Sequence, residues 1–108
     1  MIRVDIKPLS VNKCWQGKRF KTPEYKMYEK SCLMMLPKIK LPEPPYMITY
    51  VFGLSNLLSD FDNPVKPITD ILQKKYGFND RDIYEASIKK VKVEKGKEFF
   101  SFKIEKIL

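Results

Sequence analysis

Residues 46–54 read Tyr-Met-Ile-Thr-Tyr-Val-Phe-Gly-Leu, a run of β-branched and aromatic residues that predicts the clearest strand of the chain. Apolar side chains occupy both sets of alternating positions, which predicts a central strand lying under helices. The strand runs towards Ser59-Asp60-Phe61-Asp62-Asn63-Pro64. We therefore expect the acids of this segment just past the end of a central strand, where the sites of α/β sheets commonly form.

The two aspartates of this segment are separated by one residue. If the segment is extended, Asp60 and Asp62 point the same way and Phe61 points the other way. Two like charges on one face favour a bound cation, and carboxylate oxygens suit Mg²⁺. Asn63 and Pro64 are typical of the cap and first position of a helix, which would place Lys66 about one turn beyond Asp62. Paired acids, a metal and a lysine are groups that together can cleave phosphodiesters. The alternative interpretation of this segment is a capped turn whose carboxylates are solvated and have no catalytic role.

Size and composition narrow the possible classes of protein. A chain of 108 residues predicts a single domain, spanning 1–108. The net charge of +8 favours an anionic partner, which is nucleic acid or, less often, a membrane surface. The sequence contains no run of 18 apolar residues, so we expect no membrane span. The N-terminus lacks the apolar core of a signal peptide. Free thiols at Cys14 and Cys32 are expected, in a cytoplasmic protein.

The chain contains no histidine, which excludes imidazole metal ligands and histidine bases. An enzyme with this sequence must therefore use carboxylates, lysines and a metal.

Hydrophobic periodicity and turn residues predict the order of the elements. We expect strands near 2–6, 46–54, 83–93 and 100–104, helices over 23–36 and 64–76, and a small hairpin or ordered loop over 15–21 with Gly17 at its bend. Residues 94–97 have the composition of a hairpin turn between the last two strands. This order predicts an α+β domain with a mixed β-sheet and two main α-helices packed on it.

The segment before the first helix combines cations with aromatic rings. Trp15 and Phe20 alternate with lysines and an arginine, namely Lys13, Lys18, Arg19 and Lys21. Cations that meet phosphates, beside rings that stack on bases, are typical of nucleic-acid surfaces. The alternative is a solvated basic loop with two aromatic residues in the core.

Taken in order, these features resemble the RusA family of Holliday-junction resolvases over nearly the whole chain. The family's Pro-x-Ser-x-Asn turn is matched by residues 8–12, and its Asp-x-Asp-Asn with a following lysine by residues 60–63 and Lys66. The family next has a glycine followed by a hydrophobic residue, which residues 77–78 match. Its acidic turn is matched by residues 79–83, and the lysine at the end of the following strand by Lys90. Asn79 replaces the first acid of that turn, and Asp82 replaces its usual glutamine.

The resemblance implies a RusA-like fold and a metal-dependent nuclease. Asp60, Asp62 and Asp80 would bind Mg²⁺, or Mn²⁺, with Asp82 as the alternative third ligand, and Lys66 would complete the catalytic set. The substrate would be four-way junction DNA, cut by paired nicks in a homodimer. The DNA-binding residues would be Asn12, Lys13, Trp15, Lys18, Arg19, Lys21 and Lys66. The alternatives are a DNA-binding protein of the same fold that has lost catalysis, and a small nuclease acting on RNA or flapped DNA.

Overall fold

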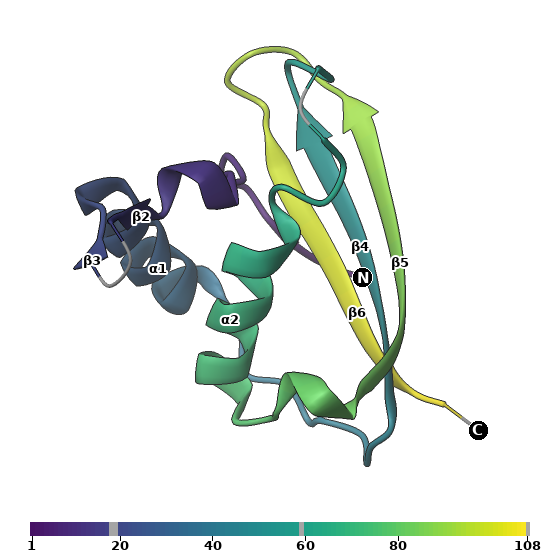
Figure 1. The fold of residues 1–108 in the computed structure, drawn as a ribbon. Helices are drawn as coiled ribbons and strands as arrows, with labels where there is room; N and C mark the ends of the chain where they lie inside the picture. The colour runs from purple at the N-terminus through teal and green to yellow at the C-terminus, as the bar shows by residue number, and fades with distance from the viewer. Residues whose placement is uncertain (18–19, 59, 108) are drawn as a thin grey trace.

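The structure is a computed structural model that describes residues 1–17, 20–58 and 60–107. Its strands, helices and 3-10 turns follow the order β1 (Ile2–Val4), η1 (Val11–Lys13), β2 (Trp15–Gln16), β3 (Phe20–Lys21), α1 (Pro23–Met35), β4 (Tyr46–Leu54), α2 (Val65–Tyr76), η2 (Asp80–Asp82), β5 (Ile83–Lys92) and β6 (Phe99–Lys106). Figure 1 shows both helices packed beside one sheet. The predicted α+β class, with a mixed sheet and two main helices, is confirmed.

The main sheet has the strand order β1-β6-β4-β5, so β4 lies between the last two strands of the chain. β4 is parallel to β5 and antiparallel to β6. The hairpin predicted at 94–97 is therefore wrong, because β5 and β6 do not pair with each other. The connection instead passes the end of β4, where the Val93 N–H donates to the Leu54 carbonyl at 2.9 Å.

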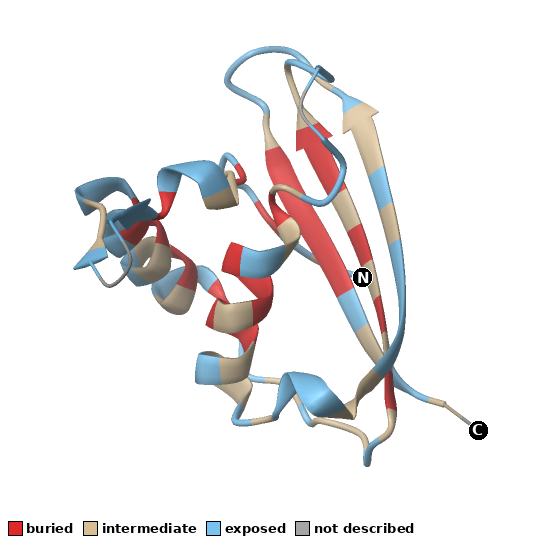
Figure 2. Ribbon diagram, viewed as in Figure 1, coloured by how far each residue is buried: buried red, intermediate tan, exposed pale blue. Residues whose placement is uncertain are grey.

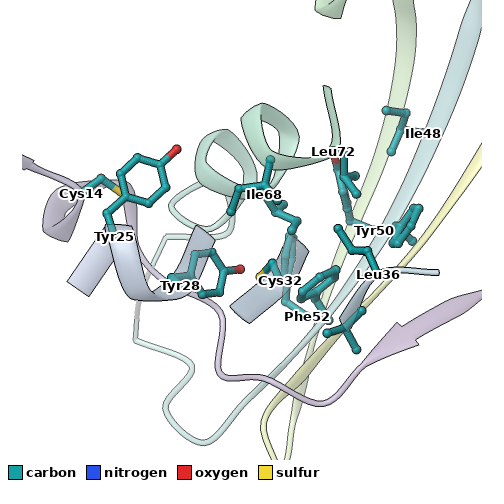
Figure 3. Packing of buried hydrophobic residues seen from close by; sticks show 14 residues of the cluster. Cys14, Tyr25, Tyr28, Cys32, Leu36, Ile48, Tyr50, Phe52, Ile68 and Leu72 are labelled. Carbon is teal, nitrogen blue, oxygen red and sulfur yellow. The ribbon is translucent and has the colours of Figure 1, made fainter. Parts of the chain in front are cut away.

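The helices cover only one face of the sheet (Figure 1). On that face β4 buries Tyr46, Ile48, Tyr50 and Phe52, while the residues that alternate with them, 47, 49 and 51, are half-buried. The expected central position of β4 under helices is confirmed, and the helices lie against one of its faces. Figure 2 shows that burial concentrates on β4, β6 and the inner side of α2, and Figure 3 shows how these side chains meet those of α1.

α1 begins with a side-chain cap followed by proline. The Thr22 Oγ1 accepts a hydrogen bond from the Tyr25 N–H at 3.1 Å, and Pro23 takes the first helical position. Tyr25, Tyr28 and Cys32 are buried, whereas Met35 is 46% exposed. Leu36, one residue further, is buried in its place, since it lies at the helix end where the chain turns towards the sheet. Cys14 and Cys32 are buried free thiols.

The start of α2 differs from the prediction. Pro64, not Asn63, stands at the cap position, and no side chain caps the helix. Pro67 fits within the first turn, where backbone N–H groups lack helical acceptors. Gly77 ends the helix as its C-cap at φ +73°, and its N–H donates to the Gln73 carbonyl at 2.8 Å. Over the described ranges, neither helix is long and apolar enough to cross a bilayer.

Candidate active site

Asp60 and Asp62 lie in the turn that leads into α2. The Asn63 N–H donates to the Asp60 carbonyl at 3.2 Å, and the Val65 N–H donates to the Asp62 carbonyl at 3.0 Å. The expected extended backbone is therefore wrong, so strand alternation no longer supports the expectation that Asp60 and Asp62 point the same way. Asp60, Phe61 and Asp62 are exposed, and neither carboxylate has a hydrogen-bond or ion-pair partner among the described residues.

The turn that carries Asn12 and Lys13 packs beside this acidic turn. The Val11 N–H donates to the Asn63 carbonyl at 2.9 Å, which ties η1 to the start of α2. Within η1 the Ser10 Oγ accepts from the Asn12 N–H at 3.2 Å, so the Pro-x-Ser-x-Asn segment holds its own shape. Asn12 and Lys13 are both exposed. The fold thus brings two predicted DNA-binding residues next to the predicted acids.

Lys13 also lines a pocket of about 340 Å³ at the same end of the sheet. Lys7, Ser10, Ser55 and Asn56 contribute to its wall. Glu24 and Glu98 line it too, so the two lysines of this pocket are matched by two acids.

Lys66 projects from the first turn of α2 towards two acids. Its Nζ lies 2.9 Å from the Asp70 Oδ1 and 4.0 Å from the Asp80 Oδ2. The hydrogen bond to Asp70 raises the pKa of Lys66, burial opposes that rise, and the charges of Asp70 and Asp80 add to it. Lys66 is therefore a protonated hydrogen-bond donor at neutral pH, not a general base.

Gln73 joins α2 to the turn that carries Asp80. Its Oε1 accepts from the Asp80 N–H at 2.9 Å, while its Nε2 donates to the Asp70 Oδ1 at 3.4 Å and to the Thr69 carbonyl at 3.3 Å. The Gln73 side chain thus contacts both Asp70, which binds Lys66, and the backbone of Asp80, whose carboxylate lies on the other side of Lys66. This network was not predicted from the sequence. The spacing of four and seven residues from Lys66 along one helix was the signal that could have found it.

The departure of Asn79 from the family pattern has a local structural role. The Asn79 Oδ1 accepts from the Arg81 N–H at 3.0 Å and caps η2. This 3-10 turn places Asp80 towards Lys66, while the Asp82 carboxylate has no hydrogen-bond or ion-pair partner in the described part of the chain. The arrangement favours Asp80 over Asp82 as the acid that acts with Lys66.

The predicted acids meet only some of the requirements of a Mg²⁺ site. Asp60 and Asp62 have free carboxylates in one turn, and one or two carboxylates together with substrate phosphates are a common Mg²⁺ environment. Across residues 1–17, 20–58 and 60–107, however, no three acidic, cysteine or histidine side chains gather in a group able to hold a metal. The structure thus joins Asp80 to Lys66 without drawing Asp60 and Asp62 into the same cluster.

The basic segment forms the predicted hairpin, in which β2 and β3 pair antiparallel and Gly17 has φ +67°. Trp15 and Phe20 are 44% and 72% exposed, so the alternative that placed both aromatics in the core is wrong. The Lys21 Nζ is 2.8 Å from the Glu29 Oε2 and lies 5.2 Å from the centre of the Tyr25 ring, so its charge is partly compensated by its own chain. Lys18 and Arg19 lie outside the described residues.

In comparisons with known proteins, no family model and no curated sequence matches the chain.

Proposed function

We propose that this chain is a Mg²⁺-dependent, structure-specific endonuclease of the RusA type that resolves four-way DNA junctions by paired nicks. One observation carries the proposal. Lys66 and Asp80 stand on separate elements, and the resemblance assigns both to the catalytic set; their charged groups are 4.0 Å apart. The free carboxylates of Asp60 and Asp62, in the turn that begins α2, add the metal-binding chemistry that such a site needs.

In this proposal Asp60, Asp62 and Asp80 would hold the ion, which is Mg²⁺ or Mn²⁺. When bound, such an ion lowers the pKa of a water molecule and stabilises charge on a phosphate and its leaving oxygen. Lys66 contributes a protonated ammonium that donates to the scissile phosphate and offsets its charge. Asp70 and Gln73 position Lys66 and Asp80 through their contacts with these residues.

The DNA would be bound by cations and by exposed rings. The net charge of +8 supports an anionic partner, and Asn12 and Lys13 stand exposed beside the acidic turn. Trp15 offers a partly exposed ring for stacking. A homodimer would present two sites to the two-fold symmetric junction, in the cytoplasm of the cell that carries the gene or that a phage has infected.

The test is the Asp62→Asn variant, which keeps the shape of the side chain and removes its charge. We expect it to bind a synthetic junction as tightly as the wild type and to lose its nicking in Mg²⁺ by at least about a hundredfold. Asp5→Asn, an exposed acid beside β1, is the matched control and should cut normally. Undiminished cleavage by Asp62→Asn would refute the role of the acid pair.

A second candidate is a DNA-binding protein of the same fold that has lost catalysis. It is favoured by the absence, among the described residues, of three acidic side chains gathered closely enough to hold a metal. It predicts tight junction binding without cleavage in Mg²⁺ or in Mn²⁺. Comparing junction, duplex, flapped and single-stranded substrates, as DNA and as RNA, would identify a nuclease of another specificity.

A further inference from the structure

β5 is an edge strand whose outer side carries no neighbouring strand in the described part of the chain. It pairs with β4 along one side from Ile83 to Lys92, and none of its ten residues is buried. Tyr84 is 73% exposed, and Figure 2 shows the strand at the margin of the buried core. A long exposed edge offers a row of unpaired backbone groups to another strand.

On the face of this strand that points away from the helices, two opposite charges lie at equal distances from Ser87. Glu85 stands two residues before Ser87 and Lys89 two residues after it. The register with β4 places all three on the face away from the helices, beside residues 47, 49 and 51. Neither Glu85 nor Lys89 has an ion-pair partner among the described residues.

This symmetry makes the strand complementary to itself. If two copies of β5 pair antiparallel about a two-fold axis at Ser87, each Glu85 lies opposite the Lys89 of the other copy. On the opposite face, Ile88 lies opposite Ala86. Moving the axis to Ala86 or to Ile88 separates Glu85 from Lys89 and removes both pairs of opposite charges.

From this geometry we propose that β5 is the surface through which a second copy of this chain binds, joining two four-stranded sheets into one. Lysines on an edge often serve to keep other strands away. Here Lys90 and Lys92 donate to the Leu57 and Ser55 carbonyls of their own chain, which leaves Lys89 as the lysine on the outward face. The choice of partner rests on the proposed function, whereas the choice of surface rests on the free edge.

Reversing the charges tests the pairing. We expect the wild type to be a dimer by sedimentation equilibrium. In the dimer, Glu85→Lys places a lysine opposite Lys89 at both pairs, and Lys89→Glu places a glutamate opposite Glu85 at both pairs. Each single variant should weaken the dimer about tenfold. The double variant Glu85→Lys/Lys89→Glu should recover wild-type dimerisation, and Lys95→Glu, outside the strand, should leave it unchanged. A monomeric wild type, single variants that dimerise normally, or a double variant that is not rescued would each overturn the proposal.

A cysteine at the axis tests the register. Two Ser87 residues facing each other would have Cβ atoms about 4.5–5.5 Å apart, close enough for a disulfide after small adjustments. Ser87→Cys should therefore form a covalent dimer on mild oxidation, while Lys95→Cys should not, and buried Cys14 and Cys32 should stay unreacted. Absence of the covalent Ser87→Cys dimer would overturn this register. Because neither experiment measures cleavage, a protein that dimerises through β5 but cuts no junction would contradict only the proposed function.

Discussion

The side-chain carbonyl of Gln73 accepts a hydrogen bond from the backbone N–H of Asp80 at 2.9 Å, which ties the middle of α2 to the turn before β5. The same Gln73 amide donates to Asp70, the partner of Lys66. The helix therefore sets the position of the opposite acid as well as that of the lysine. Loss of this link should be felt in catalysis more than in stability.

Replacing Gln73 by leucine tests this positioning role. The variant keeps the size of the side chain but removes both the acceptor for Asp80 and the donor to Asp70. We expect junction cleavage to fall about tenfold or more, while the free energy of unfolding changes by only about 1 kcal/mol, the usual net value of an exposed hydrogen bond. Single-turnover cleavage and urea unfolding measure the two quantities, and unchanged cleavage would show that Gln73 has no part in the site.

The pKa of Lys66 predicts a specific dependence of stability on pH. Its hydrogen bond to Asp70 raises the pKa in the folded state above the ordinary value of 10.5. A raised pKa means that the ammonium stabilises the fold below that ordinary value, and that the contribution is lost as the pH rises through the higher folded value. The Lys66→Met variant should therefore be less stable than the wild type at pH 8, and the difference should shrink by pH 11.5.

Urea unfolding at both pH values measures this difference, which should be small because Lys66 is 61% exposed. Lys95→Met, at an exposed turn lysine without a described ion pair, is the control and should show no such trend. An equal loss of stability at both pH values in Lys66→Met would indicate lost packing instead of lost charge.

A buried hydrogen bond between Tyr50 and Thr69 joins β4 to α2. Their side-chain oxygens are 2.7 Å apart, and burial raises the pKa of Tyr50 to about 12, so its hydroxyl stays neutral. Thr69→Val leaves the phenol unpaired and should cost about 1–3 kcal/mol. The double variant Tyr50→Phe/Thr69→Val removes both partners and should lie nearer the wild type than the sum of the single changes. Strict additivity in this cycle would show that the bond contributes nothing.

Gly53 is required by the ring that lies across it. A Cβ at this position would overlap the side chain of Phe99, which Arg3 covers from outside with its guanidinium 3.8 Å from the ring centre. Gly53→Ala should therefore destabilise the protein by about 1–3 kcal/mol. The penalty should be smaller in a Phe99→Val background, because the ring that is displaced is then absent. Thermal unfolding of the four proteins tests this, and an equal penalty in both backgrounds would place the strain elsewhere.

The element order of the fold was predictable because its signals are local. Thr22 before Pro23 starts one helix, Gly77 ends the other, and residues 46–52 contain neither glycine nor proline. The pairing of the last strands was not predictable in this way. Gly96 permits a bend both when the flanking strands pair with each other and when β4 lies between them. Only the tertiary contact of Val93 with Leu54 distinguishes these two arrangements.

For the candidate site, the sequence predicted one contact but not the local geometry. The motifs pointed to Lys66 and Asp80, which the fold brings together. The direction of Asp60 and Asp62 was wrongly derived, because the hydrogen bonds of Asn63 and Val65 close turns where an extended segment was assumed. The contact between Asp70 and Lys66 was not predicted, although their spacing of four residues within the predicted helix over 64–76 indicates it.

Cleavage of a synthetic mobile four-way junction by the wild-type protein, with and without Mg²⁺, tests the central claim most directly. The wild-type protein should produce paired nicks in opposed strands when Mg²⁺ is present, and none in the presence of a chelator. Tight binding without any nick in either Mg²⁺ or Mn²⁺, or equal cleavage in the chelator, would contradict a metal-dependent nuclease built on Asp60, Asp62 and Asp80.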